Sequence, residues 1–196
     1  MLRIHAALAA VLVAVGILPA TASAEKIDLS TVSCDQLIQS VEAGSENDKS
    51  GMAGILYWIA GYSATEEQGS VVDFKAMAKD FEKILTGCRQ QPGVGVLTMS
   101  GRYMGENATE HGAEAVDLKT MTCQAAITSN PSDSEGLGYI LMWIAGHQAS
   151  DSEDPIFDTD TFGTDMEHIG TYCGSNPSVG LLTASDEVMG TEDASE

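Results

Sequence analysis

Apolar residues recur at helical spacing over the clearest segment of this chain. From Phe74 to Cys88 they are separated mostly by three or four residues, which places them on one face of a single helix. Asp73 stands directly before this run and is a residue type that caps helix N-termini. Pro92 must end the helix, because proline lacks the backbone N–H that a helix interior needs. The pattern therefore predicts a long helix over this span and a short further helix that reaches Met99.

Two more helices are expected before the long one. Ser33 is followed three residues later by Gln36, which is the spacing of a capping box and predicts a short helix through Val41. Residues 51–64 are apolar enough to form a second, largely buried helix. No segment shows sustained alternation of apolar and polar residues, so no strand is predicted. Together these patterns predict an all-α fold.

The same unusual phrase occurs twice in the chain. ILYWIAGY (55–62) and ILMWIAGH (140–147) lie 85 residues apart, and aligning 55–99 with 140–184 without a gap gives 18 identities in 45 positions. Asp158 aligns with Asp73, and either it or Asp160 is the expected cap of the corresponding helix. The chain is therefore a tandem duplication. With only two copies, it is not expected to form a solenoid.

The four cysteines follow the duplication. Cys34 and Cys88 belong to the first copy, and Cys123 and Cys173 belong to the second. An even number of cysteines is typical of disulfide-bonded exported proteins, and we predict one bridge within each copy. Each closure is worth about 4 kcal/mol in the chain-entropy model. Pairing across the copies is the less favoured alternative, because each copy already contains a complete pair.

The duplication also predicts the domain organisation. Two small disulfide-linked units of about four helices each are expected at residues 25–100 and 120–185. The segment 101–119 between them is polar and rich in glycine, as linkers between domains often are. The chain ends in an acidic tail, 186–196. We expect two separable domains, although one chain can also pack its halves as an internal pseudo-dimer.

The first residues have the features of a secretory signal peptide. Arg3 precedes an apolar run over residues 7–18, and Ala22-Ser23-Ala24 matches a small-residue cleavage site. The apolar run is short for a membrane span. We therefore expect residues 1–24 to be removed and the remainder to be exported.

The exported part is strongly acidic. The whole chain has a formal net charge of −20, from 29 Asp and Glu against nine Lys and Arg. Of the basic residues only Arg3 precedes the cleavage site, so the exported part has a charge of −21. This charge repels nucleic acid and anionic membrane surfaces, which argues against both as partners. Apolar residues are plentiful, which argues against a disordered acidic chain.

The sequence contains no motif for catalysis or cofactor binding. GxSxG, Walker and GxGxxG motifs are absent, so neither an enzyme nor a cofactor is predicted. His147 and His168 have no flanking ligand residues and neither is repeated in the other copy, so no metal site is predicted. The stretch DTDTFGTDMEHIG at 158–170 fails as a calcium loop, because Phe162 and Ile169 occupy positions that need oxygen ligands.

The repeated unit has a characteristic pattern, which in the first copy reads SCDQL … WIAGY … DF … ILTGCRQQPGVGVL. This pattern resembles the HdeA/HdeB family of small periplasmic acid-stress chaperones. The resemblance rests on the spacing from Cys34 to Cys88, the Gly-Tyr end of the second helix, the Asp that opens the third and the Cys-x-x-x-Pro that closes it. It covers both halves of the chain. It implies a periplasmic all-α protein that loosens in acid, exposes apolar surface and prevents the aggregation of unfolded periplasmic proteins.

The resemblance also bears on oligomeric state. Members of the family are single units that dimerise at neutral pH, whereas two units are fused in this chain. A homo-oligomer and an internal pseudo-dimer are both compatible with this fusion. The family offers no catalytic residues, and only the cysteines are carried over.

The apolar helix faces are the candidate client-binding residues, because flexible Met and aromatic side chains suit many unfolded partners. Trp58 and Trp143, each three residues before a glycine, are interpreted first as core residues beside a close helix contact. The full candidate set is Trp58, Phe74, Met77, Phe81, Trp143, Phe162 and Met166.

Two other functions are left open by the sequence. A periplasmic inhibitor or immunity-type protein would use the acidic surface to bind a basic partner. A carrier would hold a small apolar ligand in a cavity between helices.

Overall fold

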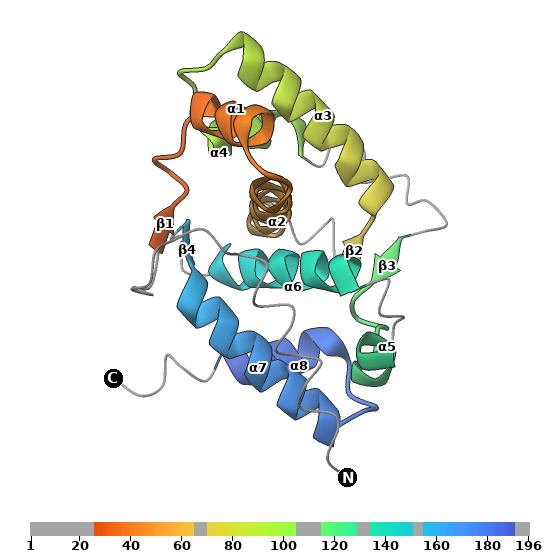
Figure 1. The fold of residues 1–196 in the computed structure, drawn as a ribbon. Helices are drawn as coiled ribbons and strands as arrows, with labels where there is room; N and C mark the ends of the chain where they lie inside the picture. The colour runs from red at the N-terminus through yellow and green to blue at the C-terminus, as the bar shows by residue number, and fades with distance from the viewer. Residues whose placement is uncertain (1–25, 65–69, 105–114, 129–133, 151–154, 191–196) are drawn as a thin grey trace.

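Both copies of the repeat fold into the same order of elements (Figure 1). The computed structural model describes residues 26–64, 70–104, 115–128, 134–150 and 155–190, so the predicted signal peptide lies outside the described residues. The first copy contains β1 (Lys26–Asp28), α1 (Cys34–Ala43), α2 (Glu46–Tyr62), β2 (Val71–Val72), α3 (Phe74–Gln90) and α4 (Val96–Tyr103). The second contains β3 (Val116–Asp117), α5 (Cys123–Thr128), α6 (Ser134–Ala149), β4 (Ile156–Asp158), α7 (Thr159–Ser175) and α8 (Leu181–Met189). The prediction of an all-α protein with about four helices per unit is confirmed.

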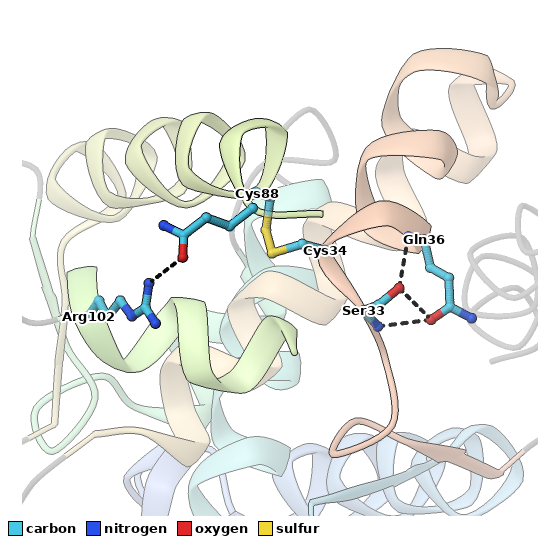
Figure 2. Close-up of a disulfide and its surroundings, with 6 residues drawn as sticks. Ser33, Cys34, Gln36, Cys88 and Arg102 are labelled. Atoms are coloured by element: carbon cyan, nitrogen blue, oxygen red, sulfur yellow. Dashed lines mark hydrogen bonds between the residues drawn. A yellow bond between two sulfur atoms is a disulfide. The ribbon is translucent and has the colours of Figure 1, made fainter. Parts of the chain in front are cut away.

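The helix starts predicted from capping residues are confirmed. At α1, the backbone N–H of Gln36 donates to Ser33 Oγ at 3.3 Å, and the Ser33 N–H donates to Gln36 Oε1 at 2.8 Å (Figure 2). At α3, the Ala76 N–H donates to Asp73 Oδ1 at 2.9 Å. Asp158 caps α7 in the same way. These short polar side chains satisfy backbone donors that the first helical turn leaves without partners.

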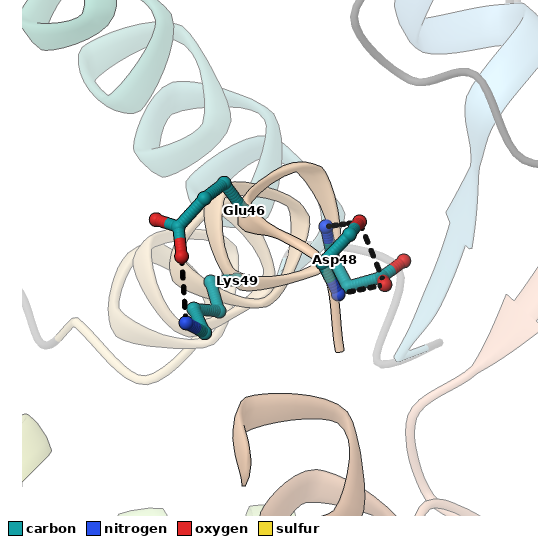
Figure 3. Close-up of polar contacts among 4 residues, drawn as sticks. Glu46, Asp48 and Lys49 are labelled. Carbon is teal, nitrogen blue, oxygen red and sulfur yellow. Dashed lines mark hydrogen bonds and ion pairs between the residues drawn. The ribbon is translucent and has the colours of Figure 1, made fainter. Parts of the chain in front are cut away.

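Helix α2 begins at Glu46, five residues before the predicted start at residue 51. A second capping box forms there, because the Ser45 N–H donates to Asp48 Oδ2 at 2.6 Å and the Asp48 N–H donates to Ser45 Oγ at 3.3 Å. Lys49 Nζ also lies 2.7 Å from Glu46 Oε1 across the first turn (Figure 3). The predicted start was late because it was placed from the apolar residues alone, and the first turn of α2 is polar.

The two disulfides form within the copies, as predicted. Cys34 is bonded to Cys88 and Cys123 to Cys173, and all four side chains are buried. The first bridge connects the start of α1 to the end of α3 (Figure 2). Each disulfide therefore joins two helices of the same copy, and all four cysteines are bonded.

Four short strands, which the sequence did not predict, join the two copies. β1 pairs antiparallel with β4, with Lys26 opposite Asp158, and β2 pairs antiparallel with β3, with Val71 opposite Asp117. Each ribbon combines the first strand of one copy with the strand that precedes the third helix of the other copy (Figure 1). Runs of two or three residues are too short to show an alternating pattern. The exchange is reciprocal, as in a two-fold symmetric dimer.

The observed elements extend beyond the predicted unit boundaries. α4 continues to Tyr103, and β3 lies inside the segment 101–119 that was predicted as a linker. Leu118, which follows β3, is fully buried, as is its counterpart Leu29 in the first copy. α8 likewise ends at Met189, inside the predicted acidic tail. A polar composition did not prevent these residues from packing, because single apolar side chains among them reach the core.

Candidate functional site

The two copies meet where α2 crosses α6. Figure 1 shows α2 end-on and α6 side-on near the centre of the molecule, with the remaining helices of each copy on opposite sides. A Cβ atom at Gly61 would overlap the carbonyl oxygen of Trp143, and one at Gly146 would overlap the carbonyl oxygen of Trp58. The two backbones therefore touch at this crossing, and only glycine fits at either position.

The reciprocal contact explains why the Trp-Ile-Ala-Gly phrase is repeated. The glycine of each helix lies against the tryptophan carbonyl of the other helix. A two-fold contact of this kind needs the same residues on both sides. The sequence interpretation of the glycines as sites of close helix approach is confirmed, and the approaching helix is the other copy of the same phrase.

Aromatic rings extend the contact on both sides of the crossing. Tyr57 in α2 stacks on Tyr139 in α6 with ring centroids 4.6 Å apart, and it also meets Phe81 in α3 edge-on at 5.0 Å. Trp58 lies edge-on to Phe157 of β4 at 6.3 Å. Contacts of this geometry contribute about 0.5–1.5 kcal/mol each beyond their buried area. Tyr57, Tyr139 and Phe157 were not among the predicted site residues, because their partners belong to the other copy or to another helix.

The hydrophobic core is shared between the copies. One buried cluster is built mainly from the first copy but includes Met142, Ala145 and Phe157 of the second. The other is built mainly from the second copy but includes Ala60 and Val72 of the first. Each half therefore covers apolar surface of the other. Independent folding of each half stays a prediction.

The predicted apolar candidates lie in or against this shared core. Trp58 is 1% exposed and Trp143 is 3% exposed. Phe74, Met77 and Phe81 are partly buried and pack against both clusters, so they line the boundary between the copies. Of the second-copy candidates, Phe162 packs against the first-copy cluster and Met166 against the second. In this structure these side chains are core residues, and their role toward clients stays a prediction.

His147 packs against a tryptophan, whereas His168 lies at the surface. His147 stacks on Trp143 with ring centroids 5.1 Å apart, and its counterpart Tyr62 stacks on Trp58 at 5.2 Å. His168 is exposed on α7. Within the described ranges no group of His, Cys, Asp and Glu side chains is arranged to hold a metal ion. The calcium-loop-like stretch forms the start of α7 instead, with Asp158 as its cap.

The carboxyl group of Asp158 contacts residues of both copies. It accepts hydrogen bonds from the backbone N–H groups of Thr161 at 3.1 Å and Asp160 at 3.0 Å, and it lies 3.3 Å from Lys26 Nζ of β1. The Thr161 hydrogen bond, helped by Lys26 and Asp160, lowers the pKa of this carboxyl below its ordinary value of 3.8, although partial burial opposes the shift.

The sign of this pKa shift fixes its effect on stability. A carboxylate with a lowered folded pKa contributes stability above its unfolded pKa, and the contribution is lost as the pH falls through the folded value. As the pH falls below the ordinary value of 3.8, the α7 cap and the Lys26 contact between the copies therefore both weaken. At the other strand pair, Ser70 Oγ donates to Asp117 Oδ1 at 2.9 Å, so a carboxylate lies at this inter-copy contact as well.

The geometry is that of two disulfide-linked helical units packed reciprocally, and comparison with known families identifies them. A family model described as the HdeA/HdeB family matches twice, at residues 3–98 and at residues 93–183. The chain belongs to the HdeA/HdeB family. The two matches cover both copies and confirm the tandem duplication. No curated protein and no solved structure matches the chain.

Membership of the HdeA/HdeB family assigns the general class of protein. The family consists of periplasmic acid-stress chaperones and not of enzymes. In the parts of the chain that the structure describes, no helix has both the length and the apolarity to cross a bilayer.

Proposed function

We propose that this chain is a periplasmic holdase that opens in acid along the interface between α2 and α6. In the open form, the apolar faces that the two copies now cover for each other would bind unfolded periplasmic proteins. The observation that carries this proposal is the shared core, in which apolar side chains of both copies are buried against each other. Both disulfides lie within a copy, so they allow the copies to separate while each keeps its own closure.

Charge supplies the driving force for opening. The exported part goes from −21 at neutral pH to +11 when all carboxylates are protonated, because eight Lys and Arg and three His remain. Repulsion is weakest near the sequence pI of about 4.2, so opening is not expected there. Further below the pI, the loss of the Asp158 contacts and the positive self-repulsion act in the same direction. We therefore expect opening below about pH 3.

The covalent fusion makes opening reversible within one molecule. Two domains of one chain are held at an effective concentration of roughly millimolar, so re-association does not depend on protein concentration. A separate-subunit dimer would instead close more slowly as it is diluted. On return to neutral pH, the fused copies would therefore close again and release their clients at any protein concentration.

A client-aggregation assay tests the proposal. The full exported chain is added to an acid-denatured client protein at pH 2–3, and light scattering is followed with and without the chain. We expect clear suppression of scattering at this pH and none at pH 7, where the apolar faces are covered. Suppression that is absent at pH 2–3 would contradict the holdase function and favour an inhibitor of a basic partner.

The Asp158→Asn substitution should shift opening to higher pH. Asparagine can still cap α7, but it cannot form the ion pair with Lys26, so the closed form loses part of its carboxylate stabilisation at neutral pH. Dye binding to exposed apolar surface, scanned from pH 5 to pH 2, measures the midpoint. The control is Asp160→Asn, because Asp160 is exposed and forms no ion pair with Lys26. Equal midpoints for both variants would show that the Lys26–Asp158 contact does not control opening.

A further inference from the structure

The two copies carry very different numbers of cationic side chains. Residues 26–104 contain seven Lys and Arg with ten acidic residues, whereas residues 115–190 contain one Lys, two His and twelve acidic residues. When all carboxylates are protonated, the formal charge of the first copy is therefore +7 and that of the second is +3. In strong acid most of the positive charge lies on one half of the molecule.

The difference is concentrated on equivalent helices. α3 carries Lys75, Lys79, Lys83 and Arg89, and α4 carries Arg102. The aligned residues in α7 and α8 are Asp160, Thr164, His168, Gly174 and Glu187, so these two helices contain no Lys or Arg. α3 lies at the top of the molecule in Figure 1, and α7 and α8 lie at the bottom. The pseudo-symmetric fold thus has a cationic end and an end whose helices α7 and α8 carry no Lys or Arg.

The cations of α3 are available at the surface. Lys75 and Lys79 are exposed, one helical turn apart on the same face of the helix. Lys83 lies 3.4 Å from Asp80, and Arg89 lies 2.9 Å from Glu42. The side chains of Lys83 and Arg89 also reach solvent, so all four cations contribute to the positive charge of the α3 end.

Exposed apolar side chains show the opposite distribution. Within the described residues, the large hydrophobic side chains that are exposed are Ile127 on α5, at 54%, and Ile156 on β4, at 41%. Both belong to the second copy. Their first-copy counterparts, Ile38 and Val71, are partly buried. The second copy therefore combines fewer cations with more accessible apolar surface.

We propose that the two copies divide the work, so that clients bind mainly to the apolar face that opening uncovers on the second copy, while the cationic α3–α4 end of the first copy stays in solvent. This inference rests on the proposed holdase function and adds that the client is positively charged. An unfolded protein at pH 2–3 is a polycation, because its carboxylates are neutral and its Lys, Arg and His are charged. The α3–α4 end repels such a chain, whereas the α7–α8 end repels it weakly. The cations of the first copy also keep loaded chaperone molecules apart.

Placing new cations on each copy in turn tests the division. Thr164→Lys with Thr171→Lys adds two lysines to α7, and Ala78→Lys with Thr86→Lys adds two to α3. All four positions are exposed, and each pair changes the charge in acid by the same amount. The probe is a fluorescent peptide rich in Leu and Lys, and its binding to the full exported chain is measured by anisotropy at pH 2.5. We expect the α7 pair to weaken binding about three- to tenfold and the α3 pair to change it less than about twofold.

The outcomes separate this inference from the holdase function. Equal weakening by both pairs, or stronger weakening by the α3 pair, overturns the division of work while peptide binding by the unaltered chain still supports the holdase. No peptide binding by the unaltered chain at pH 2.5 overturns both. Circular dichroism at pH 7 confirms that both variants fold. The expected difference must also shrink at high salt, because exposed charges are screened.

Discussion

Replacing either Gly61 or Gly146 with alanine should destabilise the closed protein by about 3 kcal/mol or more, which is severe for a single added methyl group. At each position the new Cβ would overlap a tryptophan carbonyl oxygen of the opposing helix, and a backbone atom cannot rotate away as a side chain can. The copies would have to move apart along much of the α2–α6 contact. Urea unfolding at pH 7, followed by circular dichroism, measures the loss.

Gly51→Ala provides the matched control, because Gly51 lies in the same helix and a Cβ there meets no atom within 4 Å. Alanine favours the helix over glycine, so this change should stabilise the protein by about 0.5–1 kcal/mol. If Gly61→Ala behaves like this control, then the copies do not meet at the described crossing.

Acidification should expose both tryptophans while most helices persist. Trp58 and Trp143 are the only tryptophans in the chain, and both are buried at the interface between the copies. Opening along α2 and α6 would bring both into water, so their emission should shift to longer wavelength below about pH 3. The disulfides withstand acid and limit unfolding within each copy, so far-UV circular dichroism should change little.

Single-tryptophan variants make this prediction specific. Trp58→Phe and Trp143→Phe each leave one reporter, and separation of the copies should move both reporters at the same pH. A shift of only one reporter would indicate local unfolding of one copy. Loss of helical signal at the same midpoint would indicate global unfolding, and either result contradicts opening along the interface.

The closed structure also bears on the role of the apolar candidates. Phe74, Met77 and Phe81 were chosen because they lie on one face of a helix, and in the structure that face packs against residues of both copies. A surface that is covered in one state and exposed in another serves as both core and binding site. In the proposed acid form, the departure of these first-copy side chains would uncover the second-copy surface that they cover in the neutral form, and that surface would contact clients.

The sequence by itself determined the local structure and the duplication. Ser33 and Asp73 identified helix starts because a capping side chain bonds to backbone within three residues along the chain. The disulfide pairing followed from the repeat, since each copy contains its own pair of cysteines. The family also followed from these short-range signals and their spacing. The start of α2 was missed, although the box of Ser45 and Asp48 is visible in the sequence.

Only the tertiary structure decided how the two copies combine. The strand pairs β1–β4 and β2–β3, the Tyr57–Tyr139 stack and the shared core all join residues far apart in the sequence. Periodicity reports which face of an element is apolar, but it does not report which other element covers that face. The repeated glycine showed that some helix approaches closely. The structure shows that this helix belongs to the other copy, because the two backbones touch at Gly61 and Gly146, where no side chain fits between the helices.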